Sequence, residues 1–216
     1  MIIKYNPDLL TYLNRLVAAD THSSSISRRT FTQGQSLINQ GDCPQWVYLL
    51  TGGIVKCFIT EENGRSYVLE FLGEGEMLGE LELLTGTDNL STVEALTDVT
   101  AYQISQDLFH SYLLEEPHFN RLLLQELALR LSRTAQRASY QQIFPVEYAI
   151  LKVLFLFTES QPSVSKQNLA DYLAIPVRSL NRILARLSAQ NLFTATTKTA
   201  LTVSRERLTE LIIAYH

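Results

Sequence analysis

Three arginines near the end of the chain have the spacing and the chemistry of a nucleic-acid contact. Arg178, Arg182 and Arg186 recur every four residues, so on an α-helix they lie along one side. A guanidinium fork matches both phosphate oxygens and the edge of a guanine base. These residue types predict recognition of DNA, and an ordinary solvated helix face is the alternative for the segment in isolation.

The same segment has an apolar face that would hold the arginines toward solvent. Its larger apolar residues stand at positions i, i+3, i+4 and i+7, namely Leu180, Ile183, Leu184 and Leu187. Small residues, Ala185 and Ala189, keep the cationic side slim. A slim cationic helix packed on a hydrophobic partner fits the major groove of DNA.

A supporting helix is predicted directly before it, within residues 163–173. Apolar residues recur there at helical spacing, and Ser165 is suited to cap the helix N-terminus. Pro176 fits the first turn of the following helix, where a missing N–H costs nothing. Residues 163–193 are therefore predicted to form a helix-turn-helix.

The composition is that of an ordinary soluble globular protein. The 216 residues are 46% hydrophobic and 19% charged, and they suffice for two domains. The longest apolar run, Tyr148–Phe157, is too short to cross a bilayer and contains Lys152. The N-terminus lacks the basic-then-apolar build of a signal peptide. We therefore expect a cytoplasmic protein with no membrane partner.

Charge is distributed unevenly along the chain. Residues 1–144 carry 10 basic and 17 acidic side chains, a net charge of −7. Residues 145–216 carry 8 basic and 5 acidic side chains, a net charge of +3. The positive potential thus coincides with the predicted helix-turn-helix, as attraction to phosphates requires.

The sequence contains no recognisable catalytic, metal or cofactor site. Cys43 and Cys57 have neither C-x-x-C spacing nor a nearby histidine, and we expect both to be small buried side chains. The four histidines are scattered, and no nucleophile–base pair or phosphate-binding loop can be identified. We therefore expect a protein that is not an enzyme and that holds no metal and no cofactor.

Hydrophobic periodicity divides the chain into three predicted parts. Residues 1–114 form an N-terminal domain with flanking helices, and residues 115–144 form one long helix and a hinge. Residues 145–216 form the DNA-binding domain. Its β-branched stretch at 194–203 predicts a small hairpin, or wing, before a final helix.

The first part changes from helical period to strand period. A helix is predicted at about residues 6–19 and an all-β unit, punctuated by glycines, at about residues 26–104. Within that unit, Asn63-Gly64 predicts a hairpin with a type I′ turn, because both residues readily adopt positive φ angles.

The long helix carries a seam of apolar side chains. Its residues alternate three- and four-residue steps, close to a heptad: Leu124, Leu127, Leu131, Ala135 and Ala138. Packing against the β unit of the same chain is one explanation. We favour a homodimer interface, because proteins that read two-fold DNA sites need one and a helix this long extends beyond a small domain.

The order of these elements resembles the family of the cyclic AMP receptor protein and the fumarate-nitrate reduction regulator of bacteria. The motifs that carry the resemblance are Gly34…Gly41, Tyr48-Leu49-Leu50-Thr51-Gly52-Gly53, Leu78-Gly79-Glu80-Leu81, Val93-Glu94-Ala95, Arg182-Ile183-Leu184 and Gln190-Asn191-Leu192. The resemblance implies an α+β protein with a cyclic-nucleotide-binding-type, jelly-roll-like β-roll, a long dimerisation helix and a C-terminal winged helix-turn-helix. It also implies a homodimeric transcription regulator whose roll senses a signal.

The sequence departs from this family at the nucleotide pocket. Cyclic-nucleotide binders follow the Gly-Glu pair with an Arg and then a Ser or Thr that hold the cyclic phosphate, whereas Asn89 and Leu90 stand here. Each lost charge-assisted hydrogen bond forfeits about 1.5–3 kcal/mol. We expect no tight binding of cyclic AMP or cyclic GMP, and either an unknown small-molecule effector or none. The candidate effector pocket comprises Gly79, Glu80, Leu81, Asn89, Leu90, Ser91, Ser132, Arg133 and Thr134.

The DNA-reading residues of the family carry over only in part. Family members often begin the recognition helix with an Arg-Glu pair that reads a G and a C, and here Val177 and Arg178 stand at those positions. Arg182 matches a later family arginine. Because Val177 and Arg178 differ from the family's Arg-Glu pair, we expect a different operator. The candidate DNA contacts, which include backbone-clamping positions of the supporting helix and one wing lysine, are Ser165, Lys166, Gln167, Val177, Arg178, Ser179, Arg182, Arg186 and Lys198.

Two functions are consistent with the sequence. The first is a transcription regulator that binds double-stranded DNA at a pseudo-palindromic operator as a homodimer, with RNA polymerase as a further candidate partner. The second is a degenerate cyclic-nucleotide-type sensor that acts through a protein partner and uses the winged helix as an interaction surface. The modest charge of +3 and the unusual Val177-Arg178 pair keep the second open.

Overall fold

The computed structural model describes residues 2–19, 25–157, 164–189, 193–195, 201–203 and 205–215. The chain divides into two compact units. The first comprises Ile3–Arg65 and Leu69–Arg130. The second comprises Met1–Ile2, Ser66–Val68 and Leu131–His216, so the boundary falls inside the long helix.

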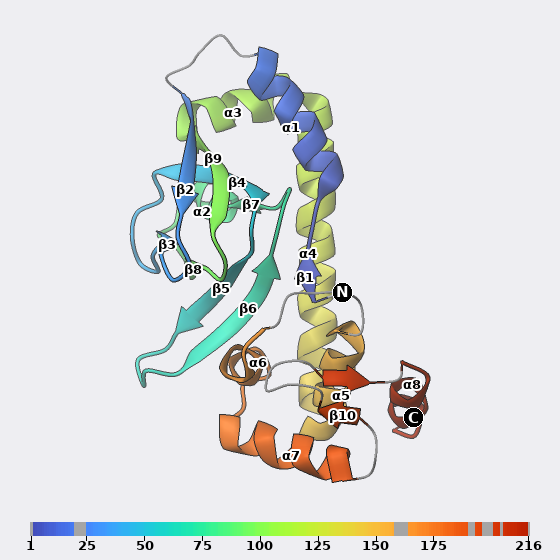
Figure 1. The fold of residues 1–216 in the computed structure, drawn as a ribbon. Helices are drawn as coiled ribbons and strands as arrows, with labels where there is room; N and C mark the ends of the chain where they lie inside the picture. Colours follow the sequence, from blue (N-terminus) through green and yellow to red (C-terminus); the bar gives the residue numbers. More distant parts are fainter. Residues whose placement is uncertain are drawn as a thin grey trace. The chain divides into compact units, whose positions relative to one another are not determined.

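The first unit is built on two β-sheets with helices. The strands of these sheets are β1 (Ile3–Lys4), β2 (Ile26–Phe31), β3 (Ser36–Ile38), β4 (Trp46–Gly52), β5 (Val55–Thr60), β6 (Ser66–Leu72, whose first three residues are grouped with the second unit), β7 (Met77–Leu78), β8 (Thr92–Ala95) and β9 (Val99–Ser105) (Figure 1). The strand order is β1-β6-β5-β8-β3 in one sheet and β2-β9-β4-β7 in the other. The predicted β-roll is therefore confirmed.

Helices precede, interrupt and follow the strands of the roll. They are α1 (Pro7–Ala19), α2 (Glu80–Thr85), α3 (Gln106–Glu115) and α4 (Pro117–Ile143). Ser105 caps α3 by accepting a hydrogen bond from the Leu108 N–H at 3.3 Å. Pro117 is the first residue of α4, and a proline is tolerated in the first turn of a helix. The helical region after β9 is therefore two helices, α3 and α4. The sequence did not predict α2, which interrupts the run of strands.

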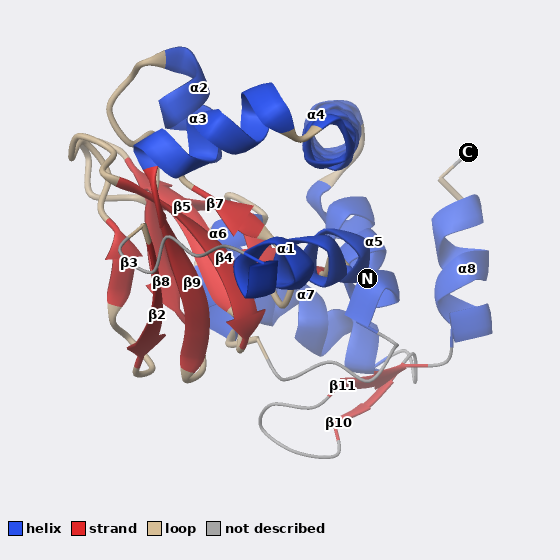
Figure 2. Cartoon of the chain, turned by 90° about the horizontal axis from the view of Figure 1, so that it is seen from above, coloured by secondary structure: helices blue, strands red, loops and turns tan. Residues whose placement is uncertain are grey.

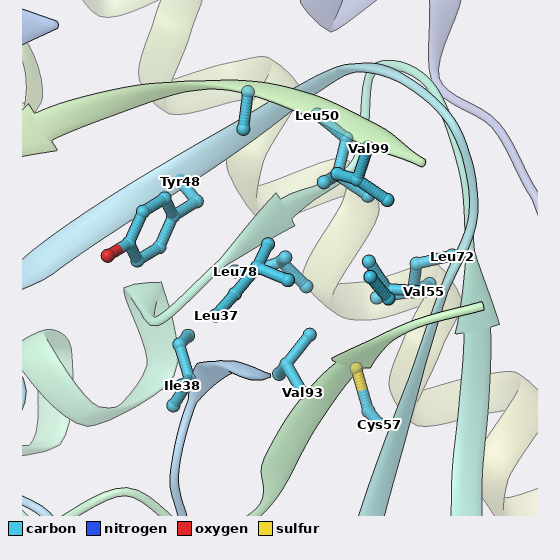
Figure 3. Close-up of a cluster of buried hydrophobic side chains, with 12 residues drawn as sticks. Leu37, Ile38, Tyr48, Leu50, Val55, Cys57, Leu72, Leu78, Val93 and Val99 are labelled. Carbon is cyan, nitrogen blue, oxygen red and sulfur yellow. The ribbon is translucent and has the colours of Figure 1, made fainter. Parts of the chain in front are cut away.

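Strand β4 separates two hydrophobic cores, because successive side chains of a strand point to opposite faces. Tyr48 and Leu50 lie in a cluster between the sheets (Figure 3). Val47 and Leu49 lie in a second cluster, which includes Phe109 of α3. Helices α1 and α3 pack on β4, and α3 also packs on β9, its neighbour in the sheet (Figure 2). The apolar run of β4 is thus buried on both faces.

The hairpin between β5 and β6 forms where it was predicted, but its turn type was predicted wrongly. The Gly64 N–H donates to the Glu61 carbonyl at 2.8 Å, and the Glu61 N–H donates to the Arg65 carbonyl at 2.9 Å. Only Gly64 has a positive φ angle, of 76°, whereas a type I′ turn needs two such residues. A longer loop that ends in a left-handed glycine suffices to reverse the chain.

The two cysteines differ, which corrects the expectation that both are buried. Cys57 is buried in the cluster between the sheets, where desolvation raises the pKa of its thiol. Cys43 is exposed. Cys43 lies in the loop before β4, and the spacing of apolar residues does not predict the exposure of a loop residue.

The second unit contains the end of α4 and a winged helix-turn-helix. Its further elements are α5 (Val146–Phe157), α6 (Lys166–Tyr172), α7 (Val177–Ala189), β10 (Phe193–Ala195), β11 (Leu201–Val203) and α8 (Arg205–Ile213). Strands β10 and β11 pair antiparallel, with Thr194 opposite Thr202. The predicted helix-turn-helix, wing hairpin and final helix are therefore confirmed.

Candidate functional site

The turn between α6 and α7 is tightly closed. Ala174 adopts a φ of 56°, the single non-glycine residue with positive φ in the described part of the chain. The Ile175 N–H donates to the Ala170 carbonyl at 3.0 Å, and the Ala174 N–H donates to Asp171 at 3.2 Å. A left-handed residue that caps a helix in this way fixes the direction in which the next helix leaves.

Helix α7 presents its arginines opposite a buried leucine face. Leu180, Leu184 and Leu187 are buried. Arg178 and Arg182 are exposed, as the helical period predicts. Val177 and Ser179, the other two candidate contacts of this helix, are half-buried. The exposed face of α7 can therefore offer guanidinium forks to phosphates and base edges.

Arg186 has a different environment from the other two arginines. Its guanidinium forms an ion pair with Glu147 of α5, within the same unit. That pairing links α7 to α5 and occupies one of the arginine's donors. The wing residue Lys198 lies outside the described residues.

The start of α6 is capped and polar. The Ser165 hydroxyl accepts a hydrogen bond from the Asn168 N–H at 3.1 Å, which confirms the predicted cap. Lys166 and Gln167 follow in the first turn and are exposed, and the Gln167 amide donates to Asp171 at 2.9 Å. Exposed donors at a helix N-terminus suit contact with a phosphate.

In the roll, the carboxylate of Glu80 forms an ion pair with an arginine of α4. Arg130 Nη1 lies 2.7 Å from Glu80 Oε1, and Arg130 Nη2 lies 2.7 Å from Glu76 Oε2. The same Nη2 donates to the Met77 carbonyl at 2.9 Å. The Nε atom lies 3.5 Å from Glu126 and 3.9 Å from Glu70. We call Arg130 with these four glutamates the Arg130 cluster.

The Arg130 cluster holds more carboxylates than cations, and it is buried. Side-chain exposure is 11% for Arg130, 2% for Glu80 and 1% for Glu76. Desolvation raises the pKa of Glu80 to about 7, although Arg130 opposes the shift. Desolvation also raises the pKa of Glu76, whose Oε1 is buried without a hydrogen-bond partner in the described structure. The cluster therefore favours uptake of a proton.

The loop around Glu80 lacks the cation that would bind the phosphate of a cyclic nucleotide. Gly79 starts α2 with a φ of 83°, and a Cβ there would lie 2.7 Å from the Trp46 carbonyl, so only glycine fits. Asn89 is buried, and its amide donates to the Asn39 carbonyl at 3.2 Å. Leu90 is 56% exposed. The two side chains at the phosphate-binding positions thus offer no cation.

The other predicted pocket residues have varied environments. Leu81 is exposed and Ser91 is half-buried. On α4, Ser132 and Thr134 are exposed and Arg133 is half-buried. The α4 residue that contacts Glu80 is Arg130, which the sequence analysis missed. Five glutamates between residues 70 and 82 were a signal that a cation must lie nearby.

The apolar seam of α4 is largely uncovered. Leu124 is 64% exposed and Leu131 is 72% exposed. Ala135 and Ala138 are also exposed, whereas Leu127 is half-buried and packs against the second core. A groove of about 510 Å³ beside Leu124 is lined by Leu114, Pro117 and Ala128, among others. The seam is thus free to meet a partner.

The described residues contain no cluster of His, Cys, Asp and Glu that could hold a metal ion. Within those residues, no helix combines the length and the apolar character needed to cross a membrane.

Comparison with known proteins gives both domain and sequence matches. Residues 28–116 match the model of the cyclic nucleotide-binding domain. The cAMP-activated global transcriptional regulator CRP of Salmonella typhimurium is 26% identical over 175 residues, which cover 76% of this chain and 83% of the relative. The regulatory protein YeiL of Escherichia coli is 24% identical over 198 residues, which cover 91% and 88%.

Solved structures share the fold. The c-di-GMP-responsive global regulator CLP of Xanthomonas campestris has a TM-score of 0.78 at 22% identity, covering 90% of this chain and 99% of that one. A CRP/FNR family transcriptional regulator of Thermus thermophilus has a TM-score of 0.74 at 17% identity, covering 88% and 100%. Residues 28–116 thus resemble a cyclic nucleotide-binding domain, and over most of its length the chain is similar in sequence and fold to CRP/FNR-type transcriptional regulators.

Proposed function

We propose that this chain is a sequence-specific DNA-binding transcription regulator that acts as a homodimer and does not respond to cyclic AMP. The observation that carries the DNA-binding part is the geometry of α7. Its leucine face is buried and its Arg178 and Arg182 are exposed on the other side, directly after the capped helix α6. The relative from Salmonella typhimurium is a global transcriptional regulator, which supports the same conclusion.

The exposed seam of α4 supports the homodimer. Leucines that are more than 60% exposed on one helix, such as Leu124 and Leu131, leave apolar area in water unless a partner covers it. A two-fold pair of α7 helices, about 34 Å apart, would then read two half-sites of a pseudo-palindrome. A second copy of the chain supplies both the cover and the symmetry.

The Arg130 cluster supports the lack of a cyclic AMP response. A nucleotide hydroxyl that approached Glu80 would have to displace a guanidinium held by Glu80 and Glu76 at 2.7 Å each. Such charge-assisted pairs are roughly twice as strong as neutral hydrogen bonds. The phosphate would then find Asn89 and Leu90 in place of a cation.

Selection of DNA from a random library by the purified full-length protein tests this function. We expect enrichment of a two-fold symmetric sequence, and a mobility shift on that sequence that is unchanged by added cyclic AMP. Enrichment of no sequence would exclude the DNA-binding function and favour a protein partner. Enrichment of an asymmetric single site would contradict the homodimer.

A further inference from the structure

A cleft that belongs to neither site described above opens at one edge of the roll. It lies between β2 and β3, each the last strand of its sheet. Its volume is about 470 Å³, within the range of small-molecule sites. Arg29, Phe31, Gln35, Tyr48 and Gln103 line it, and none of them belongs to the Arg130 cluster.

The strand register turns Arg29 toward this cleft. Ser27 pairs with Gln103, and Gln103 pairs with Tyr48 in the next strand, so these three side chains share one face of the sheet. Arg29 stands two residues after Ser27 and shares that face. Arg28, between them, pairs with Tyr102 and points to the other face. Neighbouring arginines therefore have different environments.

Three of the side chains that line the cleft, those of Gln35, Tyr48 and Gln103, have acceptor oxygens that are already used. Gln103 Oε1 accepts from Arg29 Nε at 2.7 Å and from the Ser27 hydroxyl at 3.1 Å. Gln35 Oε1 accepts from the Thr32 N–H at 2.7 Å. The Tyr48 oxygen accepts from Gln103 Nε2 at 3.0 Å.

Donors remain at the same place. Within the described part of the chain, no acceptor receives the Nη donors of Arg29 or the hydroxyl proton of Tyr48. No carboxylate lines the cleft. Residual donors and a positive charge select a ligand that carries acceptors and a negative charge.

We propose that this cleft binds a small planar organic acid. The carboxylate pairs with the Nη groups of Arg29 and accepts the Tyr48 hydroxyl proton, and the flat apolar body lies against the Phe31 ring. Phe31 packs edge-on to Tyr48 with ring centroids 6.0 Å apart, so one wall of the cleft is aromatic. The guanidinium is held by its Nε bond to Gln103, which leaves its fork oriented for a planar carboxylate.

Benzoate tests the proposal, with benzamide as its uncharged isostere and inorganic phosphate as a non-planar anion. In the full-length protein, NMR signals of the Arg29 Nε–H and the Gln103 side-chain amide should shift and saturate with benzoate. Benzamide and phosphate should bind about tenfold more weakly or worse, because each lacks the charge or the planar fit. This comparison needs no variant and is independent of whether the chain binds DNA.

Matched substitutions complete the test. Arg29→Ala should weaken benzoate binding about tenfold or more, while Arg28→Ala, one residue away on the other face, should change it less than twofold. Equal losses in both variants would overturn the site in favour of diffuse attraction. Absence of a saturable shift, or equal binding of benzoate and phosphate, would overturn the planar-acid proposal.

Discussion

Arg182 and Arg186 stand on the same side of α7 but have different partners. Arg186 is paired with Glu147, whereas Arg182 is exposed on the face that would meet DNA. Removal of Arg182 would therefore cost a DNA contact without breaking an ion pair of the described structure. Arg130, in contrast to Arg182, is a structural cation, because its side chain is buried among four glutamates.

Replacement of Arg182 should weaken binding to the selected operator. For Arg182→Ala we expect a loss of about 1–3 kcal/mol per half-site, together with relaxed preference at one base pair. Lys166→Ala should instead weaken all sequences alike and reduce the salt dependence of binding. Titrations of operator and scrambled DNA at several salt concentrations distinguish the two variants. Equal behaviour of both would contradict the assignment of Arg182 to a base.

The raised pKa of Glu80 makes stability depend on pH. Folding lifts this pKa from an ordinary carboxyl value near 4.5 to about 7, so the folded chain keeps a proton that the unfolded chain releases. Stability should therefore fall as pH rises from about 4.5 to about 7, by up to about 3 kcal/mol. Below that window both states are protonated, and above it both are ionised.

Glu80→Gln isolates this contribution. Glutamine mimics the neutral carboxyl, so the variant should lose most of the fall in stability between pH 5 and pH 7 that the natural chain shows. Chemical unfolding at a series of pH values measures the difference between the two proteins. Parallel pH profiles would show that Glu80 does not titrate in this range.

Helix α4 has two roles along its length. Its N-terminal half supplies Leu123 to the second core and Arg130 to the glutamate cluster. On another side it exposes Leu124 and Leu131. One helix thus supplies side chains both to the interior of the roll and to an exposed apolar surface.

Charge on the seam should dissociate the homodimer. Leu124→Glu with Leu131→Glu would place like charges against the partner's seam, so the variant should sediment as a monomer at micromolar concentration and lose operator binding. Leu129→Glu is the control, since Leu129 is 48% exposed on the same helix but lies off the seam. A dimer that survives the double change would place the interface elsewhere.

At the scale of the whole molecule, the parts with strong periodicity were predictable. The two-residue period predicted the strands of the roll, and the leucine spacing predicted helix α7 with its buried face. Contacts distant in sequence were not: Arg130 lies 50 residues from Glu80, and periodicity carries no information about which glutamate an arginine will meet. The same limit explains Arg186, whose partner Glu147 lies 39 residues away. The exposure of Cys43 depends on a loop, for which no period exists.

The complete protein should not be stabilised by cyclic AMP. A ligand that binds only the folded state stabilises it by about 2.7 kcal/mol at a hundred times its dissociation constant, which for a chain of this size raises the melting temperature by several degrees. We expect no shift at 1 mM cyclic AMP. The Arg130→Ala variant, in which Glu80 has lost its ion-pair partner, is the protein with which the melting-temperature shift of the natural chain should be compared. A concentration-dependent rise in the natural chain would refute the proposed insensitivity.

The Arg130–Glu80 pair also bears on how such a regulator would be controlled. A guanidinium carried on the chain is present at an effective concentration that does not change with metabolism, and it cannot diffuse away. The interaction therefore forms within the folded chain and needs no second molecule. Under the proposed function, the occupancy of Glu80 then does not follow the concentration of cyclic AMP.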